Sequence, residues 1–167
     1  MSKQKVIICH SINENLADAI SQCTYDKLFI LVDEHTRKLC IPLIQEAGFM
    51  KDAQLICIGA EDVHKNLDTL AYVWKQLGDR GATRHSLLVN LGGGMVTDLG
   101  GFAASTFKRG IKYINVPTTL LAMVDASVGG KTGINFNGLK NEIGVFSPAE
   151  SVLIDSEFLK SLDLHNL

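Results

Sequence analysis

The stretch that decides the fold of this sequence is Leu87-Leu88-Val89-Asn90-Leu91-Gly92-Gly93-Gly94. Its first five residues are typical of a buried strand, the glycines are typical of a turn, and a helix-like stretch follows at residues 95–107. A strand, a glycine turn and a helix N-terminus together favour anion binding, because the first N–H groups of the helix are free and its dipole attracts negative charge. Three glycines are equally typical of a plain tight turn, so both interpretations stay open here.

Alternating segments on both sides of this stretch predict the rest of the fold. Buried strands are expected at residues 5–8, 27–32, 54–58, 86–91 and 113–116, and residues 152–154 are a candidate for a further strand. Helices are expected at residues 13–21, 35–47, 67–77 and 95–107, with Gly48 and Gly78 as C-caps and with a kink or a fresh start at Pro42. This alternation predicts an α/β fold, Rossmann-like, with a mainly parallel sheet flanked by helices.

The helix expected at residues 67–77 has one apolar face. That face comprises Leu67, Leu70, Ala71, Trp74 and Leu77. Its spacing favours a core position for Trp74 over contact with a ligand. Beyond residue 118 glycines become frequent, which predicts a structured loop region.

Composition limits the classes of partner. With 167 residues, 46% hydrophobic content, 20% charged content and a net charge of −2, the chain is typical of one globular domain and offers no basic face for nucleic acid. No signal peptide opens the sequence and no apolar run reaches the roughly 18 residues of a membrane span, so no membrane partner is expected. The cysteines, which form no C-x-x-C pair, are expected to be reduced and mostly buried in a cytoplasmic protein; they are Cys9, Cys23, Cys40 and Cys57.

Two familiar phosphate-binding motifs are absent. A G-x-G-x-x-G motif would need glycine in place of Thr97, and a P-loop would need glycine in place of Asp125. Asp98 either stabilises the dipole in the first turn of its helix or anchors a ribose or a nicotinamide amide. Asp33, at the end of a predicted strand, either caps a helix or binds a ribose hydroxyl.

Ionisable residues gather in the otherwise small and apolar stretch at residues 115–133. Asp125 and Lys131 form either a structural ion pair or an active-site pair with shifted pKa values. Lys140 and Asn141 add a second lysine beside a hydrogen-bonding amide. The five histidines show no ligand spacing, so no metal is assigned to this chain.

Five motifs follow one another in a specific order. They are GGGxxxDL at 92–99, KRG at 108–110, VPTTLLA at 116–122, VDxSVGGKTG at 124–133 and KNxIG at 140–144. In this joint order the sequence closely resembles the 3-dehydroquinate synthase family, from about residue 33 to its last residue and over about half of a full-length member. The resemblance implies that residues 1–167 form the N-terminal NAD-binding domain, similar in architecture to iron-type alcohol dehydrogenases, and that a helical metal-binding domain follows residue 167.

The resemblance also implies an activity. The complete enzyme, a homodimer, would be a lyase of the shikimate pathway that converts 3-deoxy-D-arabino-heptulosonate 7-phosphate to 3-dehydroquinate and phosphate. It would use catalytic NAD and a divalent metal, zinc or cobalt, whose ligands lie outside this chain, so the domain alone is expected to bind NAD without turnover. Sister sugar-phosphate cyclases, of the 2-epi-5-epi-valiolone synthase or 2-deoxy-scyllo-inosose synthase type, share most of these motifs and remain an alternative. A nucleotide-binding module without chemistry is the other alternative, which the ionisable residues disfavour.

The resemblance assigns roles to individual residues. Cofactor contacts are implied for Asp33, Glu61, Lys65, Gly93, Gly94, Asp98, Thr118, Thr119, Lys131, Lys140, Phe158 and Ser161. Catalytic roles beside the substrate are implied for Asp125, Lys131, Lys140, Asn141 and Arg109. The arginine would be lent to the substrate phosphate of the neighbouring subunit. The sequence departs from the family at Thr97 and Leu139, where glycine is usual, and at Ser161, where threonine is usual.

Overall fold

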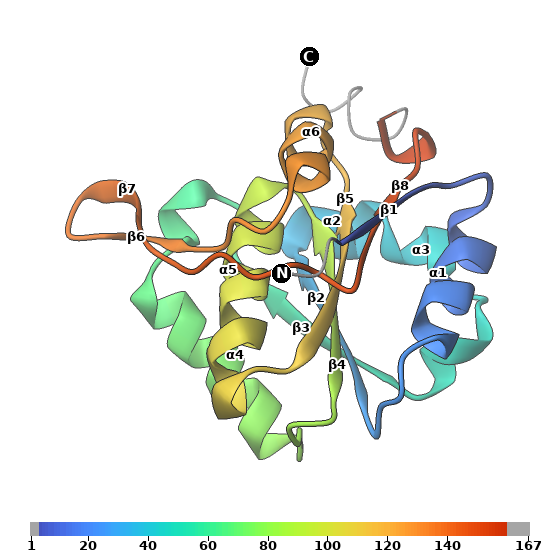
Figure 1. Ribbon diagram of the computed structural model, residues 1–167, viewed down its shortest axis with the longest axis horizontal. Coiled ribbons are helices and arrows are strands. Elements are labelled where there is room, and N and C mark those ends of the chain that lie inside the picture. The colour runs from blue at the N-terminus through green and yellow to red at the C-terminus, as the bar shows by residue number, and fades with distance from the viewer. Residues whose placement is uncertain (1–3, 160–167) are drawn as a thin grey trace.

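The computed structural model describes residues 4–159, which form a six-stranded sheet in which every pairing is parallel (Figure 1). The strand order is β1-β8-β5-β4-β2-β3. The strands are β1 (Lys5–Ile8), β2 (Leu28–Asp33), β3 (Ala53–Ile58), β4 (Leu87–Gly92), β5 (Lys112–Pro117) and β8 (Ser151–Ile154). The predicted parallel α/β fold is confirmed, and each predicted strand agrees with the structure to within one residue at either end.

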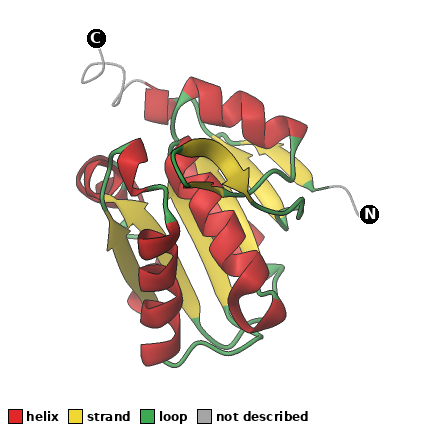
Figure 2. Ribbon diagram, turned by 90° about the vertical axis from the view of Figure 1, so that its left-hand side faces the viewer, coloured by secondary structure: helices red, strands yellow, loops and turns green. Residues whose placement is uncertain are grey.

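Helices cover both faces of this sheet (Figure 2). One face is covered by α1 (Ile12–Ser21) and α3 (Ile41–Ile44), and α2 (Glu34–Leu39) precedes α3. The other face is covered by α4 (Leu67–Asp79) and α5 (Gly94–Thr106). Successive side chains of β2 point alternately into these two cores, with Phe29 and Leu31 on one side and Ile30 on the other, so the sheet is buried on both faces.

The chain changes faces between two neighbouring strands. It leaves β2 toward α2 and α3 on one face, and it leaves β4 toward α5 on the other. Open α/β sheets bind ligands in the crevice outside the carboxyl ends of strands at such a switch point. A ligand-binding site is therefore expected beside the carboxyl ends of β2 and β4.

Two regular elements occupy the region that was expected to be loop. The helix α6 (Leu120–Val128) begins where the Thr119 hydroxyl accepts a hydrogen bond from the Ala122 N–H, at 3.2 Å. The hairpin of β6 (Ile134–Phe136) and β7 (Leu139–Ile143) turns at Asn137 and Gly138, whose φ values of 54° and 77° suit a two-residue turn with both φ values positive. The loop prediction was wrong there because frequent glycines mark the turns of this region and not the short elements between them.

Helix ends also depart from expectation. The predicted helix at residues 35–47 is two helices, and Pro42 lies in the first turn of α3, which confirms the fresh start. Neither predicted C-cap glycine is one: Gly48 begins the 3-10 helix η1 (Gly48–Lys51), and Gly78 lies inside α4. That helix is terminated by Gly81, which has a φ of 82° that suits glycine.

Burial corrects three further expectations. The buried face of α4 consists of Leu70, Val73 and Leu77 with Trp74 packed against it, whereas Leu67 and Ala71 are exposed. Among the described residues, β1 is an edge strand that pairs with β8, and its side chains are mostly exposed. Cys40 alone of the four free cysteines is buried, because the other three lie at the margins of the core. Within residues 4–159, no helix combines the length and apolar character needed to cross a membrane.

Candidate functional site

The glycine turn lies at the carboxyl end of β4. Gly92 ends the strand, and a Cβ there would lie 2.6 Å from Val96 Cγ2, so a side chain would clash with the helix that follows. Gly93 is the N-cap of α5, with no side chain to cap it, and the space beside Gly94 is open to at least 4 Å. The N-terminus of α5 therefore presents backbone to an open space, as a site for a diphosphate requires.

A buried lysine ties this helix to the hairpin. Lys65 follows the 3-10 helix η2 (Asp62–His64) and is 5% exposed. Its Nζ lies 2.7 Å from Asp98 Oδ2 on α5 and donates to Asn141 Oδ1 on β7, at 2.5 Å. Burial raises the pKa of Asp98, and the contact with Lys65 opposes that rise. Asp98 lies in the second turn of α5, not the first as expected, because the helix begins at Gly94.

A cleft of about 580 Å³ opens beside the turn and the hairpin. Of the predicted residues, it is lined by Gly94, Asp98, Asp125, Lys131 and Asn141. These residues come from α5, α6, the segment that follows α6, and β7. The structure thus brings together the glycine turn and most of the ionisable cluster, although they are distant in sequence.

Asp125 and Lys131 are exposed side chains of this cleft. The ion pairs among residues 4–159 are Lys65–Asp98 and Lys75–Asp79, so Asp125 and Lys131 do not form the structural ion pair that was one interpretation. Lys140, next to Asn141 on β7, is exposed and lies outside the cleft lining. Unpaired charges in an open cleft remain available to a ligand.

Three other predicted residues lie along the carboxyl edge of the sheet. Asp33 caps α2: its Oδ1 accepts from the Thr36 N–H at 2.8 Å, and Thr36 Oγ1 accepts from the Asp33 N–H at 3.0 Å. Thr119 caps α6. Thr118 is buried, and its hydroxyl has no hydrogen-bond partner among the described residues. Such a hydroxyl beside the glycine turn is suited to a ligand that supplies the missing partner.

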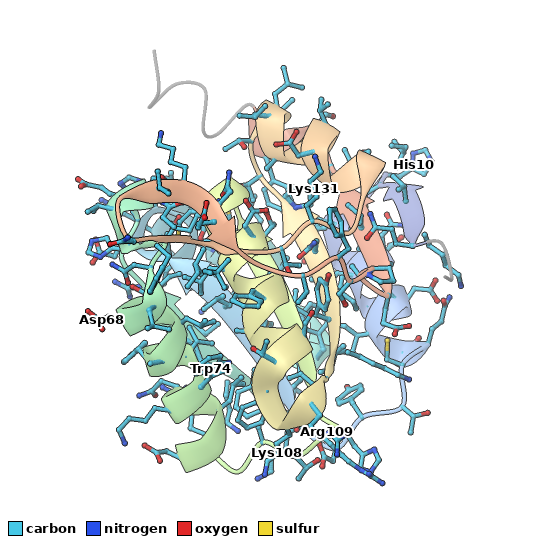
Figure 3. The ribbon with its side chains drawn as sticks, turned by 60° about the vertical axis from the view of Figure 1, so that its left-hand side comes forward. His10, Asp68, Trp74, Lys108, Arg109 and Lys131 are labelled. Atoms are coloured by element: carbon cyan, nitrogen blue, oxygen red, sulfur yellow. The ribbon has the colours of Figure 1, made fainter. Side chains whose placement is uncertain are left out.

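The remaining predicted residues lie elsewhere. Glu61 is exposed just before η2, and the side chain of Phe158 is fully buried in the core. Ser161 lies outside the described residues. Arg109 is exposed on the 3-10 helix η3 (Phe107–Arg109), at the opposite end of the molecule from Lys131 (Figure 3). Lys108 and Arg109 have positive φ values of 47° and 71°, a conformation that costs free energy in residues other than glycine.

Several residues that line the cleft were not predicted as site residues from the sequence. Thr97, Tyr113, Asn115, Glu142 and Phe146 also line the cleft. Asn115 offered a signal, because it and Asn90 are polar residues in two runs that otherwise predict buried strands. The others gave no signal in the sequence, because their elements are distant along the chain and meet only in the folded domain.

The parallel sheet, the glycine turn and the cleft at the carboxyl edge define a Rossmann-like α/β domain. The family model described as 3-dehydroquinate synthase N-terminal matches residues 55–167. The chain belongs to the 3-dehydroquinate synthase family.

Curated relatives agree with this assignment. The 3-dehydroquinate synthase of Parabacteroides distasonis is 54% identical over 167 residues, which are 100% of this chain and 47% of the relative. That of Pyrococcus furiosus is 44% identical over 151 residues, 89% of this chain and 44% of the relative. The chain therefore spans about half the length of these relatives.

Solved structures share the fold. The 2-epi-5-epi-valiolone synthase from Streptomyces hygroscopicus subsp. jinggangensis, solved with NAD+ and Zn2+ bound, superposes with a TM-score of 0.83 at 32% identity over 95% of this chain and 44% of that one. A 2-deoxy-scyllo-inosose synthase in complex with carbaglucose-6-phosphate, NAD+ and Co2+ has a TM-score of 0.82 at 24% identity over 92% and 42% of the two chains, which shows likeness of fold alone.

Proposed function

We propose that this chain is the NAD-binding N-terminal half of a 3-dehydroquinate synthase. The complete enzyme would convert 3-deoxy-D-arabino-heptulosonate 7-phosphate to 3-dehydroquinate and phosphate, and residues 1–167 alone would bind NAD without turnover. The observation that carries the proposal is one cleft in which the N-terminus of α5 and Asp98 face Asp125, Lys131 and Asn141. A cofactor site and a set of charged groups beside it are what a cofactor-dependent reaction on a sugar phosphate needs.

The cofactor fits the turn at the end of β4. The free N–H groups around Gly93 and Gly94 would hold the diphosphate, and the unpartnered Thr118 hydroxyl would gain a hydrogen bond. Asp33 lies at the end of β2, where α/β domains hold a ribose, and Asp98 would anchor the nicotinamide end. The adenosine contacts of Glu61 and Lys65, and those of Thr119, Phe158 and Ser161, remain proposals from the family resemblance.

The substrate would lie on the other side of the cleft. Lys131 would attract the negative phosphate, and Asn141 and Asp125 would hold hydroxyl groups. The role of Lys140, which lies outside the cleft lining, is proposed from the family resemblance. When bound, NAD supplies a hydride acceptor that is regenerated within the reaction. Since Arg109 lies far from this cleft, it would act on the neighbouring subunit of a homodimer (Figure 3). Its exposure and its strained turn are consistent with such a role.

A divalent metal, zinc or cobalt, is proposed for the complete enzyme only. Across the described ranges of this chain, no three His, Cys, Asp or Glu side chains gather as a metal site. No step is therefore assigned to a metal held by these residues. The 2-epi-5-epi-valiolone synthase structure, which was solved with both NAD+ and Zn2+ bound, supports the pairing of cofactor and metal.

A sister cyclase is the second candidate. The 2-epi-5-epi-valiolone synthase structure, at 32% identity, supports it. The relative from Parabacteroides distasonis, at 54% identity over the whole chain, favours the 3-dehydroquinate synthase assignment. A module that only binds nucleotide is disfavoured, because Asp125 and Lys131 stand unpaired in the cleft without a structural role.

Calorimetric titration of this chain with NAD and with NADP tests the proposal. NAD should bind saturably and NADP poorly, since Asp33 would repel a 2′-phosphate. Asp98→Ala should weaken NAD binding about tenfold, whereas Asp79→Ala, which removes an exposed carboxylate of α4, should leave the Kd unchanged. Absence of NAD binding by the unmodified chain would contradict the proposal.

A further inference from the structure

Two asparagines lie side by side within the sheet. Asn90 on β4 and Asn115 on β5 are direct register partners, and α5 covers Asn90 at Gly100. Asn90 is 0% exposed, and its Nδ2 donates to Asn115 Oδ1 at 3.0 Å. A polar pair at this depth is unusual in strands whose neighbouring residues are apolar.

Stability alone does not explain the pair. Asn90 Oδ1 is buried and has no hydrogen-bond partner in the described part of the chain. A Cβ added to Gly100 would lie 2.0 Å from that oxygen, so the helix approaches the sheet closely enough for contact only because it has glycine there. A buried amide whose oxygen has no hydrogen-bond partner destabilises a core relative to an apolar residue of similar shape.

The hydrogen bond fixes which end of the second amide faces the ligand. The Oδ1 of Asn115 accepts the hydrogen bond from Asn90 Nδ2. The Nδ2 of Asn115 has no hydrogen-bond partner among residues 4–159. Asn115 is half-buried and lines the cleft together with Asp98, Asp125 and Lys131. The carboxylates of that lining accept hydrogen bonds and the lysine is a cation, whereas Asn115 provides a neutral donor whose orientation is set by Asn90.

We propose that Asn115 donates a hydrogen bond from Nδ2 to an acceptor oxygen of the bound ligand, and that Asn90 is the positioning residue that sets the orientation of this amide. The inference rests on the function proposed above. Two oxygens have the required chemistry: the carboxamide oxygen of the nicotinamide and an oxygen of the sugar phosphate. The experiment separates these two sources.

The first measurement needs no ligand. Side-chain amide NMR of this chain should show the Asn90 NH2 protected from exchange with water and the Asn115 NH2 exchanging freely, because only the former is buried and bonded. Protection of the Asn115 NH2 instead would mean that the amide presents its oxygen to the cleft, and it would overturn the proposal.

The second measurement is calorimetric titration of Asn115→Leu with NAD, with ADP-ribose and with the seven-carbon sugar phosphate in the presence of NAD. If the affinity for NAD falls about fivefold or more while that for ADP-ribose is unchanged, the acceptor is the nicotinamide oxygen. If only the affinity for the sugar phosphate falls, the acceptor is an oxygen of the substrate. The control is Asn13→Leu on α1, which makes the same substitution at an asparagine outside the cleft.

Asn90→Ala tests the positioning role. It should weaken binding of the same ligand that Asn115→Leu affects. The double variant should lose no more affinity than Asn115→Leu alone, because both substitutions remove the same hydrogen bond to the ligand. A lower unfolding temperature with unchanged affinity would show a merely structural role for Asn90. Unchanged affinity of Asn115→Leu for every ligand that the unmodified chain binds would overturn the inference and leave the proposed function intact. An unmodified chain that binds none of them would overturn both.

Discussion

Individual residues of the site show how an ionisable group is accommodated in a nearly buried position. Lys65 is the clearest case, since its ammonium contacts the carboxylate of Asp98 and the amide oxygen of Asn141. Removing one partner of such a pair leaves the other charge without compensation, which costs more than the pair contributes when it is intact.

Lys65→Met is expected to lower the free energy of unfolding by about 1–3 kcal/mol, less than for a fully buried pair because Asp98 is partly open to water. Urea denaturation measures this change. The matched control is Lys75→Met, which breaks the exposed Lys75–Asp79 pair and should change stability little. Equal effects of the two substitutions would contradict the structural role given to Lys65.

The sequence predicted single site residues unevenly. Gly94, Asp98, Asp125, Lys131 and Asn141 were predicted and line one cleft, since motif order reflects the loops that meet at the carboxyl edge. The choice between a cap and a ligand for Asp33 could not be made from sequence, because both roles need a carboxylate at the same position. The structure shows the cap and leaves the ribose contact as a prediction.

At the scale of elements, glycines inside helices have opposite consequences in α4 and α5. Gly100 of α5 lies against Asn90, where an added Cβ would overlap the amide. Gly78 of α4 is exposed, and an added Cβ would meet nothing within 4 Å. Replacement by alanine should therefore change the free energy of unfolding in opposite directions at the two positions.

Gly100→Ala is expected to destabilise the domain by about 1–3 kcal/mol through overpacking, and Gly78→Ala to stabilise it by about 0.5–1 kcal/mol through helix propensity. Thermal and urea unfolding of both variants would measure the two effects. A Gly100→Ala variant as stable as the unmodified chain would show that α5 can move away from the sheet at no cost.

Elements with a clear apolar pattern were predicted well, and those without one were not. The strands at 5–8 and 54–58 were predicted because runs of β-branched residues bounded by turn residues are typical of strands. The helix α6 was missed because it is apolar on most sides and shows no clear period. The hairpin was missed although Asn137-Gly138 is a strong turn signal, since its strands are exposed and lack alternation.

Across the whole molecule, many of the large exposed apolar side chains belong to a few elements. Large apolar side chains are exposed on α6 and around the hairpin, beside the cleft; they are Leu120, Leu121, Val124, Phe136, Leu139, Ile143, Val145 and Phe146. Leu121 is 72% exposed and Phe146 is 74% exposed. Large exposed apolar side chains gathered on a few elements are typical of surface that another polypeptide segment covers.

This chain is accordingly expected to self-associate in solution. Leu121→Lys combined with Val124→Lys should reduce the association, because both side chains lie on the exposed face of α6. Leu43→Lys on α3, an exposed apolar residue outside this group, should not. Light scattering over a range of concentrations measures the effect, and an unmodified chain that stays monomeric throughout would refute the expectation.

The pairing of β1 with β8 has a consequence for how the molecule is made. Lys5 lies opposite Ser151, so the strand that leaves the ribosome before the other five has its only neighbour in one of the last described segments. During synthesis, β2, β3, β4 and β5 can associate while β1 waits without a partner. The edge of the sheet is therefore completed late, and a released chain that ended before residue 151 would leave β1 without the strand it pairs with.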